Sequence, residues 1–105
     1  MNGTDPLILP RRLAIALLAE AQRADGAPVH GVIAARDNVP TSLQPNATAA
    51  HEPYSTWARY RSGTGDPDGS EGRQLLVSID TKGVLQLRCW ERSARAAVER
   101  ELRII

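Results

Sequence analysis

The sequence predicts one small α+β domain over residues 1–105, in which an N-terminal amphipathic helix packs on a mixed or antiparallel sheet with a C-terminal hairpin. A chain of 105 residues has room for one modest core. Its 42% hydrophobic and 24% charged residues are typical of a globular protein and too apolar for general disorder. Apolar residues recur with a helical period near the N-terminus and alternate, as in strands, between residues 75 and 89.

The helix is expected between Pro10 and Asp25. Proline is tolerated in the first turn of a helix, where its missing N–H would have no partner. Gly26 suits the left-handed conformation that often closes a helix, and Pro28 prevents continuation. One face of this helix carries the apolar residues Leu13, Ala14, Leu17, Leu18 and Ala21.

Two extended segments are expected after the helix. Residues 29–35 are apolar and bounded by turn residues, which predicts a buried strand. Residues 39–44 are interpreted as an edge segment, because Pro40 cannot donate a ladder hydrogen bond. Residues 54–60 follow Pro53 and are interpreted as one or two turns of helix.

The clearest hairpin lies between residues 75 and 89. Apolar residues alternate on both sides of a turn at residues 80–83, in which Gly83 is able to adopt a positive φ. The alternation places Cys89 on the inward side, as a small buried hydrophobe and not a nucleophile. The residues expected to pack together as the core are Leu17, Val32, Val77 and Leu87.

Two further segments lack a clear strand or helix pattern and are interpreted from their amino-acid composition. Residues 62–72 hold glycines and acids without a large apolar residue, which predicts a flexible surface loop. Residues 94–105 match both a helix and a terminal strand, and both interpretations stay open.

The net charge and the numbers of cysteines and histidines exclude several classes of function. A formal net charge of +1 gives no overall attraction to nucleic acid or to an acidic membrane. One cysteine and two histidines cannot form an intramolecular disulfide or a four-ligand zinc cage by themselves. The first residues lack the pattern of a signal peptide, and no apolar run reaches membrane-spanning length. We therefore expect a cytoplasmic protein with no membrane association and no cofactor.

Several short motifs occur in a recognisable order. A helix precedes the strand motif Pro28–Ile33, then come Pro45-Asn46, a Leu-Leu-Val-Ser strand at residues 75–78 and a Glu-Leu-Arg-Ile-Ile ending. This order resembles the bacterial MPN/JAMM domain family. The resemblance implies a zinc-dependent isopeptidase ancestry, with some members acting on ubiquitin-like or sulfur-carrier proteins. Such enzymes need a glutamate on the first central strand, then His-x-His-Pro and Ser-x-x-Asp, which hold and activate a zinc-bound water.

This sequence departs from that pattern at the metal site. His30 occupies the position that matches the glutamate, and no histidine lies between Tyr60 and Arg73. The resemblance therefore implies a degenerate member that lacks the His-x-His motif, with neither catalytic nor metal-ligating residues. We expect a binding or scaffold module for a protein partner, ubiquitin-like or a sulfur carrier, acting as a monomer or a homodimer. The candidate partner-binding residues are His30, Asn46, His51, Trp57, Arg59, Tyr60 and Arg61.

Two alternatives from other classes stay open. The first is a zinc-dependent hydrolase with a rearranged site, built from His30 and His51 with Asp66 or Asp68. The second is a nucleic-acid binder, because aromatic and arginine side chains stack on bases and hold phosphates. Its patch consists of Trp57, Arg59, Tyr60, Arg61 and Arg73. The near-neutral charge and the acids at residues 66–71 argue against this second alternative.

Overall fold

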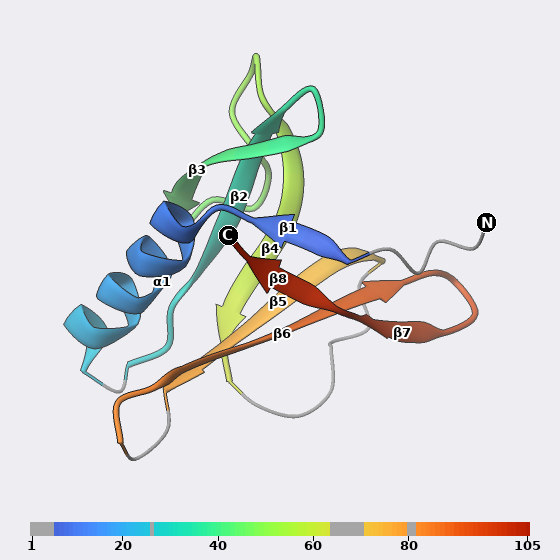
Figure 1. Cartoon of the computed structure of the whole chain (residues 1–105). Coiled ribbons are helices and arrows are strands. Elements are labelled where there is room, and N and C mark those ends of the chain that lie inside the picture. The colour runs from blue at the N-terminus through green and yellow to red at the C-terminus, as the bar shows by residue number, and fades with distance from the viewer. Residues whose placement is uncertain (1–5, 26, 64–70, 80–81) are drawn as a thin grey trace.

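The computed structural model describes residues 6–25, 27–63, 71–79 and 82–105. Within these ranges the chain forms one helix and eight strands (Figure 1). In chain order they are β1 (Leu7–Leu9), α1 (Arg11–Ala24), β2 (His30–Arg36), β3 (Val39–Pro45), β4 (Ser55–Ser62), β5 (Gly72–Ile79), β6 (Leu85–Arg92), β7 (Ala97–Arg100) and β8 (Leu102–Ile104).

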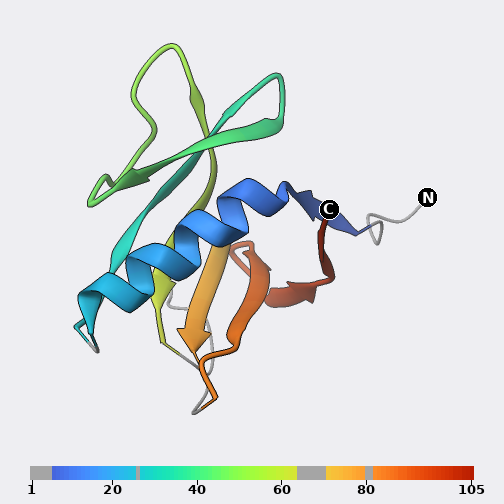
Figure 2. The same ribbon diagram turned by 60° about the vertical axis from the view of Figure 1, so that its left-hand side comes forward.

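Six of the strands form one sheet in the order β3-β2-β4-β5-β6-β7. Its neighbours are antiparallel except β4 and β5, which run parallel. The two ends of the chain meet in a separate parallel pair, β1 with β8. Figure 2 shows α1 lying across one face of the strands, so the six-stranded sheet has a helix-covered face and an opposite face.

The α+β class predicted from the sequence is wrong. The described chain is mostly strand, with a single helix of 14 residues beside a six-stranded sheet. Two segments account for the difference: residues 54–60 supply most of the central strand β4, and residues 94–105 supply β7 and β8. Both carry weak local patterns, and pairing with neighbouring strands overrides such preferences.

The helix itself begins after Pro10, whose carbonyl accepts hydrogen bonds from the N–H groups of Leu13 and Ala14. Leu13, Ala14 and Leu17 are buried, as the apolar stripe predicts. The left-handed residue at its C-terminal end is Asp25, at φ 50°, whereas the sequence pointed to Gly26, which lies outside the described residues. No described helix is both long and apolar enough to cross a membrane.

The core lies between α1 and the helix-covered face of the sheet. Leu17 and Val77 belong to it, and Leu87 is partly buried against it. Val32 is fully buried but lies on the opposite face, so the prediction that it packs with the other three is wrong. The reason is strand alternation: its neighbour Ile33 takes the position toward the helix.

β5 and β6 pair antiparallel, as expected for the two strands of the predicted hairpin, and their register places Leu75 opposite Cys89. Cys89 is buried in the core. Most of the loop predicted at residues 62–72 lies outside the described residues, because residues 64–70 are not among them. Its two ends, Ser62 and Gly72, are the last residue of β4 and the first of β5.

Candidate functional site

The face of the sheet opposite α1 carries a concentration of basic side chains. Cross-strand register places His30 of β2 beside Arg61 of β4, and Val32 beside Arg59. β4 also pairs in parallel with β5, and this pairing places Gln74 of β5 next to Arg59. Residues paired directly across a sheet project from the same face. The alternation of β4 therefore puts both arginines on this face and Tyr60, between them, on the other.

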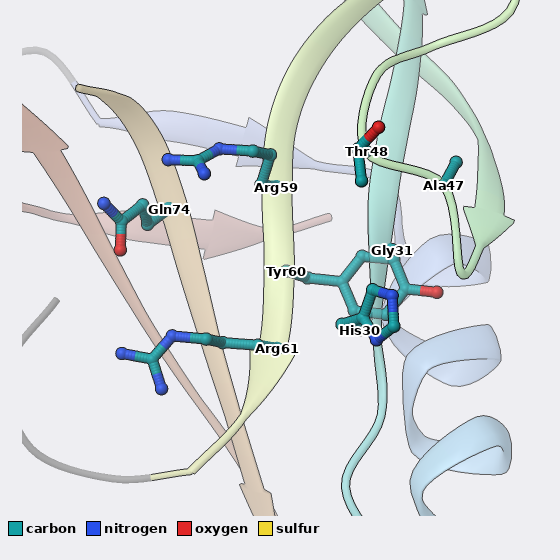
Figure 3. Close-up of a pocket in the computed structure, with 8 residues that line it drawn as sticks. All are labelled: His30, Gly31, Ala47, Thr48, Arg59, Tyr60, Arg61 and Gln74. Carbon is teal, nitrogen blue, oxygen red and sulfur yellow. The ribbon is translucent and has the colours of Figure 1, made fainter. Parts of the chain in front are cut away.

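A pocket of about 200 Å³ lies on this face over β2 and β4. Figure 3 shows the Arg59 and Arg61 side chains extending from β4 toward Gln74, with His30 on the other side of β4. The residues that line it are His30, Gly31, Ala47, Thr48, Arg59, Tyr60, Arg61 and Gln74. We call this site the arginine pocket.

The described lining of the arginine pocket contains two arginines and a histidine but no carboxylate. One terminal nitrogen of Arg59 donates a hydrogen bond of 3.3 Å to the carbonyl oxygen of Glu71, which orients the guanidinium. A guanidinium presents planar, paired donors that match a carboxylate or a phosphate. The arrangement is therefore suited to binding an anionic group.

Tyr60 fixes β4 from the other side of the sheet. It lies directly opposite Gly31 on β2, and its hydroxyl donates to Glu20 of α1, with oxygen–oxygen distances of 2.7 and 3.0 Å. A Cβ atom on Gly31 would lie 2.6 Å from the Tyr60 hydroxyl oxygen, so the ring needs a glycine at this position. Burial, and then the hydrogen bond to Glu20, raise the pKa of Tyr60 well above its ordinary value.

The connection from β3 to β4 borders the arginine pocket and is held by specific hydrogen bonds. The N–H of Asn46 donates to the carbonyl of His30 at 2.8 Å, and the N–H of His51 donates to the side chain of Gln44 at 2.9 Å. Asn46 has a positive φ of 65°, which asparagine tolerates better than most residues. These contacts position Ala47 and Thr48 at the pocket.

The structure brings together some of the candidate residues and separates others. His30, Arg59, Tyr60 and Arg61 line the same pocket. Asn46 and His51 donate backbone hydrogen bonds beside this pocket and are not part of its lining. Trp57 is 9% exposed and belongs to the core on the helix-covered face.

The aromatic and arginine residues predicted to bind nucleic acid lie on two different faces of the sheet. The rings of Trp57 and Tyr60 are buried in the core, whereas Arg59 and Arg61 project from the opposite face. The aromatic residue that shares a face with the arginines is Trp90 of β6, paired with Gln74. The Arg88 guanidinium lies 5.2 Å from its ring centroid.

Neither metal binding nor thiol chemistry has a centre in the part of the chain that the structure describes. There, no group of three or more His, Cys, Asp or Glu residues is placed to hold a metal ion. Asp66 and Asp68, required by the rearranged zinc site, lie outside the described residues. Burial is the largest effect on the Cys89 thiol and raises its pKa to about 11, so it stays protonated at neutral pH.

Sequence reasoning missed Thr48 and Gln74 as pocket residues. The sequence does contain an indication for Gln74, because it is a polar residue at the start of the apolar run of β5. In the structure, Gln74 is only 3% exposed. No local sequence pattern points to Thr48, because its position depends on how the connection between β3 and β4 folds.

The fold and the arginine pocket together define a small, mostly β domain with a basic pocket on one sheet face. No protein-family model matches the chain, and no curated protein matches it. Its structure is similar to the solution structure of protein DSY2949 from Desulfitobacterium hafniense, with a TM-score of 0.74 over 94% of this chain and 92% of that chain. The two sequences are 11% identical, so the similarity concerns the fold alone. The MPN/JAMM resemblance stays a prediction.

Proposed function

We propose that this protein is a non-catalytic binding domain whose arginine pocket holds a carboxylate group of an acidic protein partner. The observation that carries the proposal is the pocket lining, in which strand register places Arg59, Arg61 and His30 on one face of the sheet. Hydrogen bonds between charged partners are roughly twice as strong as neutral ones. Two guanidinium groups from one strand therefore favour an anionic side chain or chain end.

The size of the pocket supports a small anionic group and not a large ligand. Its volume of about 200 Å³ lies below the range of roughly 300–1,000 Å³ that is typical of cofactor and small-molecule sites. A partner protein would insert one side chain here and make its remaining contacts on the surrounding sheet face. The MPN/JAMM resemblance names a ubiquitin-like or sulfur-carrier protein as such a partner, and this narrower assignment is part of the proposal.

Protein is favoured over nucleic acid by charge and by the burial of the aromatic rings. The net charge of +1 provides little long-range attraction to a polyanion. Trp57 and Tyr60, which were the candidates for stacking on bases, are 9% and 2% exposed. Bases stack only on rings whose faces are accessible.

The test uses a synthetic peptide of alternating glycine and glutamate, titrated into the protein and followed by NMR. The double variant Arg59→Ala with Arg61→Ala is expected to weaken binding about tenfold or more, which corresponds to about 1.4 kcal/mol. The control variant, Arg95→Ala with Arg103→Ala, removes the same charge from exposed arginines elsewhere. It is expected to change the affinity by less than about twofold at physiological salt, where exposed charges are screened.

Three results would overturn the proposal. One is an equal loss of peptide affinity in both double variants, which would mean that the peptide binds through the net charge of the protein alone. Another is equal binding of a peptide in which glutamine replaces glutamate. A third is tighter binding of a single-stranded oligonucleotide through Arg59 and Arg61, which would favour the nucleic-acid alternative.

A further inference from the structure

A second pocket, of about 480 Å³, lies at the other end of β4 and shares no lining residue with the arginine pocket. It is an open pocket lined by β1, by the turn between β2 and β3, and by two side chains of the sheet. Its apolar lining includes Leu7, Ile8, Val39, Pro40 and Trp57. Arg73 is the charged residue of this described lining. We call this site the Trp57 pocket.

The rim of the Trp57 pocket exposes large apolar side chains. Ile8 is 44% exposed and Val39 is 57% exposed, although they come from segments distant in the sequence. Exposed apolar residues gathered around a concave site mark binding surfaces more often than isolated ones do. Both residues are therefore available to contact an apolar ligand.

Arg73 is held by three interactions, and it shares its carboxylate partner with a second arginine. Its guanidinium lies 4.8 Å from the ring centroid of Trp57, donates to the Trp57 carbonyl at 3.3 Å, and forms an ion pair with Glu91 at 3.1 Å. Glu91 also accepts a hydrogen bond from Arg100, so one carboxylate serves two guanidinium groups. A guanidinium has five N–H donors, and the buried Nε of Arg73 has no acceptor among the described residues.

We propose that the Trp57 pocket binds an apolar group that carries one carboxylate. The apolar part packs against Leu7, Ile8 and Val39, next to the largely buried Trp57, and the carboxylate accepts hydrogen bonds from Arg73. The volume lies within the range typical of small-molecule sites. Such chemistry is found in a small aromatic or aliphatic acid and in the C-terminal residue of a polypeptide. A cationic ligand is disfavoured because Arg73 would repel it.

The experiment monitors the pocket through Trp57. The chain has two tryptophans, so Trp90→Phe leaves Trp57 as the single indole fluorophore. This variant is titrated with 4-phenylbutyrate, which represents a small acid, and with N-acetylleucine, which represents a polypeptide end. We expect saturable changes in fluorescence with at least one acid, and about tenfold weaker binding of the corresponding uncharged amide. The tighter of the two acids identifies the source of the carboxylate.

Variants at the rim make the test specific. Val39→Glu places a negative charge at the mouth of the pocket and is expected to weaken binding of the acid at least fivefold. Val39→Lys is the matched control, since it alters the same exposed residue with the opposite charge, and it is expected to retain binding. Arg59→Ala, in the arginine pocket, is expected to leave the titration unchanged.

NMR of the unmodified chain provides a second measurement that does not depend on the folding of Trp90→Phe. The amide signals of Ile8 and Val39 are expected to shift with the acid. The proposal is overturned if neither acid binds below about 10 mM, if the amides bind as well as the acids, or if Val39→Glu and Val39→Lys behave alike. Loss of binding in Arg59→Ala would also overturn it, without bearing on the peptide test of the arginine pocket.

Discussion

Gly31 and Tyr60 determine how β4 presents its arginines. The Tyr60 ring lies over Gly31, where a Cβ atom would meet both the Tyr60 hydroxyl oxygen at 2.6 Å and the carbonyl oxygen of Gln44 at 2.7 Å. An aromatic ring that covers a glycine on the adjacent strand is a recurrent device for fixing register. Because Tyr60 points toward α1, its neighbours Arg59 and Arg61 must project from the opposite face. One glycine therefore supports the geometry of the arginine pocket.

The burial of Tyr60, together with its hydrogen bond to Glu20, predicts a pH dependence of stability. Its pKa is higher in the folded state than in the unfolded state, so the folded state favours the protonated phenol. The stabilisation is complete below about pH 10, the ordinary pKa of tyrosine, and declines as the pH rises above that value. We expect the free energy of unfolding in urea to fall less steeply above pH 10 in Tyr60→Phe than in the unmodified chain.

Tyr54→Phe is the matched control, because Tyr54 is the other tyrosine of the chain. The buried Cys89 thiol also contributes to the decline at high pH, since its pKa is raised to about 11, but it is present in both variants. If the two phenylalanine variants show the same alkaline profile, the contribution assigned to Tyr60 is wrong.

Among the secondary-structure elements, β4 and β5 carry most of the architecture. They are the central pair of the six-stranded sheet, and β4 holds residues of both faces: Tyr60 in the core, Arg59 and Arg61 in the arginine pocket. β5 contributes Leu75 and Val77 to the core. Damage to this pair is therefore expected to unfold the domain, whereas the edge strands should tolerate change.

Val77→Ala tests this difference between central and edge strands. Val77 is 1% exposed, and removing its buried methyl groups is expected to lower the free energy of unfolding by about 2 kcal/mol from lost transfer energy and the resulting cavity. Val98→Ala, the same substitution at a residue of β7 that is 57% exposed, is expected to cost less than about 0.5 kcal/mol. The measurement is urea unfolding of both variants. Equal losses would contradict the assignment of Val77 to the core.

At the scale of the whole molecule, the two pockets are separate features of one sheet. The arginine pocket lies on the face opposite α1, and the Trp57 pocket is bounded by β1 and by core residues of the helix-covered face. No lining residue is common to both. The domain therefore has two candidate sites for anionic groups in spite of a net charge of only +1.

Because the two pockets share no lining residue, we expect a ligand in one pocket to leave binding in the other unchanged. Saturation of the arginine pocket with the glutamate peptide is expected to leave the dissociation constant of 4-phenylbutyrate unchanged within about twofold, because the coupling free energy between the sites is close to zero. Fluorescence of Trp57 in Trp90→Phe measures both titrations. Mutual displacement of the peptide and the acid would instead mean that they occupy one site.

The elements with strong, local patterns could be predicted from the amino-acid sequence. The apolar stripe of α1, the buried strand β2 and the pairing of β5 with β6 follow from hydrophobic periodicity and turn residues, which act within a few residues of the chain. In contrast, long-range pairing is what makes most of residues 54–60 part of the central strand β4 and forms β7 and β8 within residues 94–105. Their preferences are weak, and hydrogen bonds to distant strands outweigh them.

The same division holds for the candidate sites. The sequence could identify His30, Arg59 and Arg61 as candidate binding residues, but only strand register placed them around one pocket and put Trp57 in the core. The Trp57 pocket had no local signal at all, because β1, the turn between β2 and β3, and Arg73 meet only in the folded chain. In a sheet, a shift of one residue moves a side chain to the opposite face, so register, which depends on long-range pairing, decides which residues form a site.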